Sequence, residues 1–159
     1  MAGIDALLSE LDYPMFIVTT AAGGERGGCL VGFGSQVTID SSRFLVCLSD
    51  KNRTCRIARG ATHLAVHFVP ADREDLAELF GGETGDEVDK LAQTDWHEGL
   101  EGMPLIDGCA NRFVGRILER YVFGDHVGYL LDPVTVDHGT EGAEFTFHRA
   151  KRIEPGHAA

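Results

Sequence analysis

Short apolar segments rich in β-branched and aromatic residues follow one another along the chain, several of them separated only by a turn. This pattern predicts strands at residues 15–20, 29–33, 37–39, 44–48, 63–69, 109–122, 127–136 and 144–148. A doubly wound nucleotide-binding fold requires a helix between successive strands, so the order of segments excludes that class. We expect a mainly β domain, a small β-barrel with a few short helices at its periphery.

Three segments have the apolar spacing of short helices: residues 3–11, 52–59 and 72–80. Gly60 is expected to end the second helix, and Asp72 to cap the start of the third. The glycine-rich residues 21–28 predict a hairpin loop, and residues 124–126 predict the turn between the two longest strands. Residues 81–107 predict a loop with short helices. We expect one domain over residues 1–154 and a disordered tail at residues 155–159.

The net charge of −11 comes largely from one segment, since residues 71–107 contain twelve of the 25 acidic residues and two of the 14 basic ones. Nucleic acid is disfavoured as a partner, because binding phosphates needs a basic surface. The rest of the chain is balanced in charge and can hold a local cationic site. No apolar run approaches the roughly 20 residues of a membrane helix, and no signal peptide is visible. We therefore expect a cytoplasmic protein that does not bind membranes.

The four cysteines, at positions 29, 47, 55 and 109, form no CxxC pair. We expect reduced thiols, with Cys47 in an apolar strand and buried in the hydrophobic core. No pair of cysteines or histidines has the spacing of zinc ligands, so no metal site is predicted.

One polar segment follows a predicted buried strand at the start of a predicted helix. Free amides at a helix start, beside cations, favour anion binding. From spacing alone, a phosphate site and an ordinary capped helix with solvated bases are equally acceptable. The segment lacks the glycine-rich loop of an ATP-binding site. Its candidate anion ligands are Ser49, Lys51, Asn52, Arg53 and Thr54.

Two other segments carry candidate ligands. Glycines 32 and 34 lie inside a predicted strand, where they are costly unless a ligand or another backbone comes close, although a β-bulge would also explain them. Asp125 and His126 lie in a predicted hairpin turn, where His126 is either incidental or a ligand-binding imidazole at the barrel rim. No nucleophile motif is present. A bound cofactor that performs the chemistry itself therefore suits this chain.

In their order and spacing, these motifs resemble those of the flavin reductase-like proteins, which are FMN-binding split barrels that act as NAD(P)H:flavin oxidoreductases. The similarity covers residues 11 to 136. It is carried by residues 32–40, 44–54, 63–68, 75–82, 89–91, 96, 104–108 and 124–126.

The resemblance implies a Greek-key split β-barrel in a homodimer, with FMN or FAD near the subunit interface and NADH or NADPH as hydride donor. His126 would act at the flavin or the nicotinamide as the catalytic residue. Residues 32–38 would line the flavin ring, and residues 49–54 would hold the phosphate. The cofactor-binding residues so implied are Gly32, Phe33, Gly34, Ser35, Gln36, Val37, Ser49, Lys51, Asn52, Arg53, Thr54 and Asp125.

The chain also departs from the family pattern. Gly32-Phe33-Gly34-Ser35-Gln36 stands where relatives often have Asn-Ser-Phe-Thr-Ser, so backbone contacts to the ring are expected more than side-chain contacts. Asp50 adds a carboxylate to the phosphate segment and is expected to point away. A monooxygenase component is an expected partner that would use the reduced flavin. Two alternatives stay open: a non-catalytic flavin, deazaflavin or haem carrier, and a subunit whose acidic residues 71–107 dock a basic partner.

Overall fold

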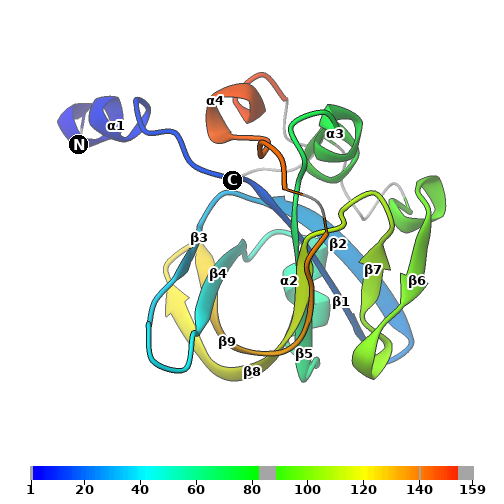
Figure 1. The fold of residues 1–159 in the computed structure, drawn as a ribbon. Helices are drawn as coiled ribbons and strands as arrows, with labels where there is room; N and C mark the ends of the chain where they lie inside the picture. The colour runs from blue at the N-terminus through cyan, green and yellow to red at the C-terminus, as the bar shows by residue number, and fades with distance from the viewer. Residues whose placement is uncertain (1, 83–88, 140, 154–159) are drawn as a thin grey trace.

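The structure, a computed structural model, describes residues 2–82, 89–139 and 141–153. Its body is one seven-stranded sheet in which every pair of neighbouring strands is antiparallel (Figure 1). The prediction of a mainly β fold with short helices is confirmed. From edge to edge, the strands are β2 (Glu25–Val31), β1 (Phe16–Ala22), β5 (His63–Phe68), β8 (Arg112–Phe123), β9 (His126–Asp137), β4 (Phe44–Ser49) and β3 (Gly34–Gln36).

The two edges of this sheet lie close together. Strands β2 and β3 are at opposite edges, yet only Gly32 and Phe33 separate them in the sequence. Such a short connection spans no more than about 10 Å, so the sheet has to curl on itself. Figure 1 shows the strong bend of β8 and β9 that results. The curled sheet encloses the main core, which includes Phe16, Val18, Val46, Leu48, Leu64, Val66, Phe113, Tyr129 and Leu131.

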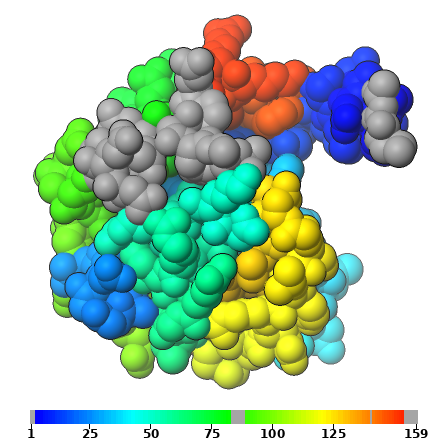
Figure 2. Space-filling view, turned by 180° about the vertical axis from the view of Figure 1, so that it is seen from behind, coloured from blue at the N-terminus to red at the C-terminus, as the bar shows by residue number. Residues whose placement is uncertain are grey.

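Within the described residues, four α-helices flank the sheet. Helix α1 (Ala2–Leu8) projects from the body beside α4 (Phe147–Ala150), as Figures 1 and 2 show. Helix α2 (Arg53–Ala58) packs on β1 and β2, and α3 (Glu74–Gly82) packs on β2. The three predicted helices are present, but one predicted cap is wrong, because α3 begins after Asp72, at Glu74. Gly60 follows directly on Arg59, the C-cap of α2, as expected of a glycine that ends a helix, although its φ is not left-handed.

The predicted loop at residues 21–28 is too long. Only Gly23 and Gly24 form the turn, with left-handed φ values of 60° and 80°, and β2 begins at Glu25. Glycines 27 and 28 lie within the strand because α2 and α3 pack closely over it. A Cβ atom on Gly28 would lie 2.8 Å from Cε1 of Phe80. These glycines therefore allow close packing rather than a turn.

Two predicted strands are wrong and one hairpin was not predicted. Residues 37–39 form an exposed loop, in which Ile39 is 92% exposed. Residues 144–148 form two isolated bridges, Glu144 with Pro70 and Thr146 with Pro14, before α4 begins. Within residues 81–107, β6 (Trp96–Glu98) and β7 (Pro104–Ile106) form a separate two-stranded sheet, near 3-10 turns at Leu91–Gln93 and Leu100–Gly102. The predicted tail at 155–159 lies outside the described residues.

All four cysteines are free thiols. Cys29, Cys55 and Cys109 are buried, whereas Cys47 is only half-buried, so its predicted place in the core is wrong. Side chains alternate between the two faces of β4, and Cys47 lies on the less covered face. Among the described residues, no helix is both long enough and apolar enough to cross a membrane.

Candidate functional site

Three segments that are far apart in the sequence meet where β3 begins, β4 ends and β9 begins. The amide of Cys47 donates a hydrogen bond to the carbonyl of Phe33 over 2.8 Å. The amide of Asp50 donates to the carbonyl of Asp125 over 2.9 Å, and Ser49 pairs with His126 across the two strands. The structure thus brings Phe33, residues 49–50 and residues 125–126 to one corner of the sheet. Ser35, Gln36 and Val37 instead follow β3 toward the other end of β4, where Gln36 pairs with Phe44 and the amide of Val37 donates to the carbonyl of Arg43.

An aromatic ring and an imidazole face each other at this corner. The rings of Phe33 and His126 lie 5.1 Å apart, and Phe33 is 55% exposed. The carboxylate of Asp125 contacts Nδ1 of His126 at 2.8 Å. The hydrogen bond from His126 lowers the pKa of Asp125. His126 lies at the start of β9 rather than in the turn, and among the described residues its Nε2 atom has no hydrogen bond.

The glycines of the first segment are explained by packing within the chain. A Cβ atom on Gly34 would lie 3.1 Å from Phe16 and 3.3 Å from Phe44, and one on Gly32 would lie 3.1 Å from Tyr13. The close approach predicted at these glycines is therefore made by the chain's own aromatic side chains. Between them, Phe33 points outward, and beyond them three further candidate residues are exposed: Ser35, Gln36 and Val37.

The second segment presents one exposed cation, Lys51. Asn52 is the N-cap of α2, because its Oδ1 atom accepts a hydrogen bond from the amide of Thr54 over 2.9 Å. Thr54 is 1% exposed. Arg53 lies along β2, where Nη1 donates to the carbonyl of Arg26 over 2.7 Å. In this structure Lys51 is thus more accessible to an anion than Arg53 or Thr54.

Asp50 carries the one described buried side-chain polar atom that has no hydrogen-bond partner, its Oδ1. A buried acceptor without a donor costs about 1–3 kcal/mol, so such atoms usually mark a place for a water molecule or a ligand group. Its backbone amide at the same time ties the second segment to Asp125. The corner therefore holds an open acceptor between its two polar segments.

A network that the sequence did not reveal fixes α2 against the β8–β9 hairpin. Arg120 on β8 donates to the carbonyls of Ala58 and Ala61, over 3.0 and 2.6 Å. Its guanidinium lies 5.6 Å from the ring centre of Tyr129, whose hydroxyl is 3.5 Å from the thiol of Cys55. Burial raises the pKa of Tyr129. The helix that follows residues 49–52 and the hairpin that carries His126 are therefore held as one unit.

A family model described as "Flavin reductase like domain" matches residues 8–154. The chain is similar to a protein from Ancylobacter novellus named FMN reductase (NADH) RutF, with 29% identity over 75% of this chain and 65% of that protein. It is also similar to the 4-hydroxyphenylacetate 3-monooxygenase reductase component of Pseudomonas aeruginosa, with 25% identity over 79% of this chain and 74% of that protein. Among solved structures, a flavin reductase domain protein from Arthrobacter superimposes on this chain with a TM-score of 0.83 and 17% identity. The match covers 92% of this chain and 89% of that one, so the two proteins share the same fold.

Proposed function

The chain belongs to the flavin reductase-like family, and on that premise we propose that it is an oxidoreductase that passes hydride from NADH or NADPH to FMN, or to FAD. The observation that carries the proposal is the meeting of three sequence segments at one corner, with Phe33 and His126 5.1 Å apart and Asp50 bonded to Asp125. The relative named FMN reductase (NADH) supports FMN as the flavin and NADH as the donor.

The residues at the corner fit a flavin nucleotide. The exposed ring of Phe33 offers an apolar face for a planar ring system. Exposed Lys51, beside the capped start of α2, suits a phosphate. Against the expectation that Asp50 points away, we assign its buried Oδ1 to accept a hydrogen bond from a hydroxyl group of the sugar-like chain between ring and phosphate, once the bound ligand opens a path to it. Thus an aromatic face, a hydrogen-bond acceptor and a cation are all available at one site.

When bound, the flavin supplies the chemistry, because its ring accepts hydride and later gives up electrons. The protein has to orient the reactants and needs no acid or base of its own. We assign to His126 the alignment of the nicotinamide. Asp125 occupies its Nδ1 atom and so fixes the ring, which leaves Nε2 to contact a ligand.

The same proposal includes the finer features that the family resemblance implies: a split barrel, a homodimer and a cytoplasmic location. Large apolar side chains remain exposed on β3, on the loop after it and on the β8–β9 hairpin, which supports a second copy covering this part of the surface: Phe33 and the hairpin residues Tyr121, Val122 and Phe123 near the corner, and Val37 and Ile39 beyond the other end of β3. The relative named as a monooxygenase reductase component supports a monooxygenase that takes up the reduced flavin. Residues 1–154 are proposed to act as one domain.

The decisive experiment is anaerobic stopped-flow reduction of bound flavin, with NADH and NADPH each tested against FMN and FAD. We expect rapid loss of the absorbance of the oxidised flavin with at least one pair. A matched variant, Phe33→Ala, should weaken flavin binding, whereas Val134→Ala, at an exposed position of β9 far from the corner, should not. Binding without reduction would favour the carrier alternative, and failure to bind any flavin would contradict the proposal.

A further inference from the structure

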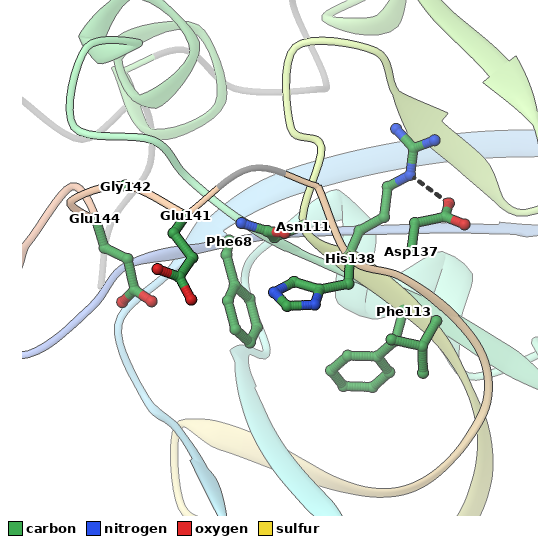
Figure 3. A pocket seen from close by; sticks show the side chains of 10 residues that line it. Phe68, Asn111, Phe113, Asp137, His138, Glu141, Gly142 and Glu144 are labelled. Atoms are coloured by element: carbon green, nitrogen blue, oxygen red, sulfur yellow. Dashed lines mark hydrogen bonds and ion pairs between the residues drawn. The ribbon is translucent and has the colours of Figure 1, made fainter.

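A cavity lies at the end of the β8–β9 ribbon that is opposite its turn. Its volume is about 550 Å³, and it is bounded by the end of β5, the start of β8, the end of β9 and residues 141–144 (Figure 3). At this end of the ribbon Arg112 pairs with Asp137, whereas Phe123 pairs with His126 at the other end. None of the residues assigned to the flavin lines the cavity.

The inner wall of the cavity is aromatic. It contains half-buried Phe68 and buried Phe113. The ring of Phe68 contacts Phe16 at 5.3 Å, Phe16 contacts Phe44 at 5.4 Å, and Phe44 contacts Phe113 at 5.5 Å, in edge-to-face arrangements. Because these rings interlock with the main core, the wall is a preformed surface rather than a set of mobile side chains.

The charged side chains around the cavity leave an excess of negative charge. The Nε atom of Arg112 binds Oδ2 of Asp137 at 2.8 Å, and its Nη1 atom donates to the carbonyl of Ile106, so this pair is internally satisfied. Glu141 and Glu144 have no hydrogen bond or ion pair with any other described residue. In Figure 3 the carboxylate of Glu141 is drawn next to the ring of Phe68, and that of Glu144 is drawn farther from this ring.

The backbone on both sides of Glu144 is fixed to the rest of the fold. The amide of Ala71 donates to the carbonyl of Ala143 over 2.9 Å, and the amide of Phe145 donates to the carbonyl of Val69 over 2.8 Å. Glu144 is therefore held at the rim of a cavity whose inner wall is an aromatic surface, and Glu141 adds a second carboxylate to that rim.

We propose that this cavity binds a small organic cation, namely an ammonium group attached to an apolar or aromatic body. The ammonium would lie between the carboxylates and the face of Phe68, where ion pairing and cation–π attraction act together. The apolar body would cover Phe113. Among the described residues, no group of three histidine, cysteine or acidic side chains is arranged to hold a metal ion, which favours an organic cation over a metal.

The test uses the full chain and 2-phenylethylammonium as the probe, with 2-phenylethanol as its neutral counterpart. Backbone amide shifts in nitrogen-15 NMR spectra locate the bound probe and give its affinity. We expect saturable shifts at residues 68, 111, 113 and 141–144 in the millimolar range or below, and at least tenfold weaker binding of the alcohol. Because the proposed site is remote from the flavin residues, the result does not depend on whether the chain reduces flavin.

Matched variants distinguish the contribution of the two carboxylates to binding from that of the cavity itself. Glu141→Gln and Glu144→Gln should each weaken ammonium binding about threefold, and the double variant about tenfold, while leaving the alcohol unchanged. Glu119→Gln, at an exposed glutamate on β8 outside the cavity, should have no effect. The proposal is overturned if the probe shifts no amides around the cavity, if the alcohol binds as well as the ammonium, or if the double variant binds like the parent protein.

Discussion

Replacing His67 with glutamine should remove much of the protein's sensitivity to mild acid. His67 on β5 is fully buried; one ring nitrogen, Nδ1, lies 2.9 Å from the carbonyl of Ile17, and the other, Nε2, lies 3.0 Å from the amide of Ile106. Since the Ile106 amide can only donate, Nε2 has to accept, and the proton is on Nδ1. A second proton, on Nε2, would point at the N–H group of Ile106 and so place two hydrogen-bond donors against each other in a buried site.

The size of the effect follows from the pKa of His67. Burial, together with the positive charge of Arg112, lowers it from 6.5 to about 4, against the opposing hydrogen bond to Ile17. The unfolded chain therefore binds this proton at a higher pH than the folded chain does, and stability present above pH 6.5 is lost as the pH falls towards 4. The full loss is about 3 kcal/mol, of which about 2 kcal/mol falls between pH 7 and pH 5.

The assay is urea unfolding of the parent protein, His67→Gln and His138→Gln at a series of pH values. The control removes an exposed histidine, so all three curves share the titration of the carboxylates. We expect the parent and the control to lose about 2 kcal/mol more than His67→Gln between pH 7 and pH 5. Equal pH slopes for all three proteins would refute the reasoning. If His67→Gln does not fold, an NMR titration of the parent settles the point, since a His67 pKa near 6.5 would refute it too.

Three further predictions concern the corner and the acidic segment. Arg53→Ala should weaken the binding of FMN roughly tenfold in fluorescence titrations, because Arg53 is expected to turn from β2 to the phosphate when the ligand binds. The binding of riboflavin, which lacks the phosphate, should weaken much less, and Arg59→Ala is the exposed control. Equal losses of affinity for both flavins would show that Arg53 does not contact the phosphate. His126→Ala should keep flavin affinity within a few-fold of the parent value but slow the reduction of the flavin about tenfold in stopped-flow experiments. His126→Asn should recover part of that rate. An unchanged rate in His126→Ala would show that His126 has no role in the reduction. Lys90→Met should cost roughly 1–3 kcal/mol in urea unfolding, because the buried ammonium donates to the carbonyl of Phe80 over 2.8 Å; a cost near zero would show that this bond contributes little.

The strands that could be predicted are those whose local pattern agrees with their tertiary surroundings. Residues 44–48 and 63–69 are apolar and are paired on both sides in the sheet. Residues 37–39 have the same β-branched character, but the sheet ends at β3 and the segment leaves it as an exposed loop. Residues 144–148 alternate like a strand, yet only Phe145 is buried and two bridges are all that form. Local propensity does not show whether a partner strand is available.

The sequence predicts which residues form the candidate site, and that membership stays a prediction, but it does not predict how these residues are arranged. The order of the motifs assigns residues 32–37, 49–54 and 125–126 to one ligand, and the pairing of Ser49 with His126 joins the second of these segments to the third. The direction of Arg53 along β2 depends on the Arg26 carbonyl, on a strand that the sequence predicted as a loop. The buried oxygen of Asp50 and the contact of Arg120 with the end of α2 depend on packing between distant segments, which no local pattern reveals.

The two-residue link between the edge strands has a consequence for folding. The β1–β2 and β8–β9 hairpins are local in sequence and can form early, whereas the pairing of β4 with β9 joins residues nearly half the chain apart. Strand β3 pairs only with β4, in a hairpin that is local in sequence, so both strands reach their place in the sheet when β4 pairs with β9. The corner that carries Phe33 and His126 is thus completed late on the folding pathway. A ligand that binds there should leave the folding rate almost unchanged and act mainly by slowing the rate at which the native chain unfolds.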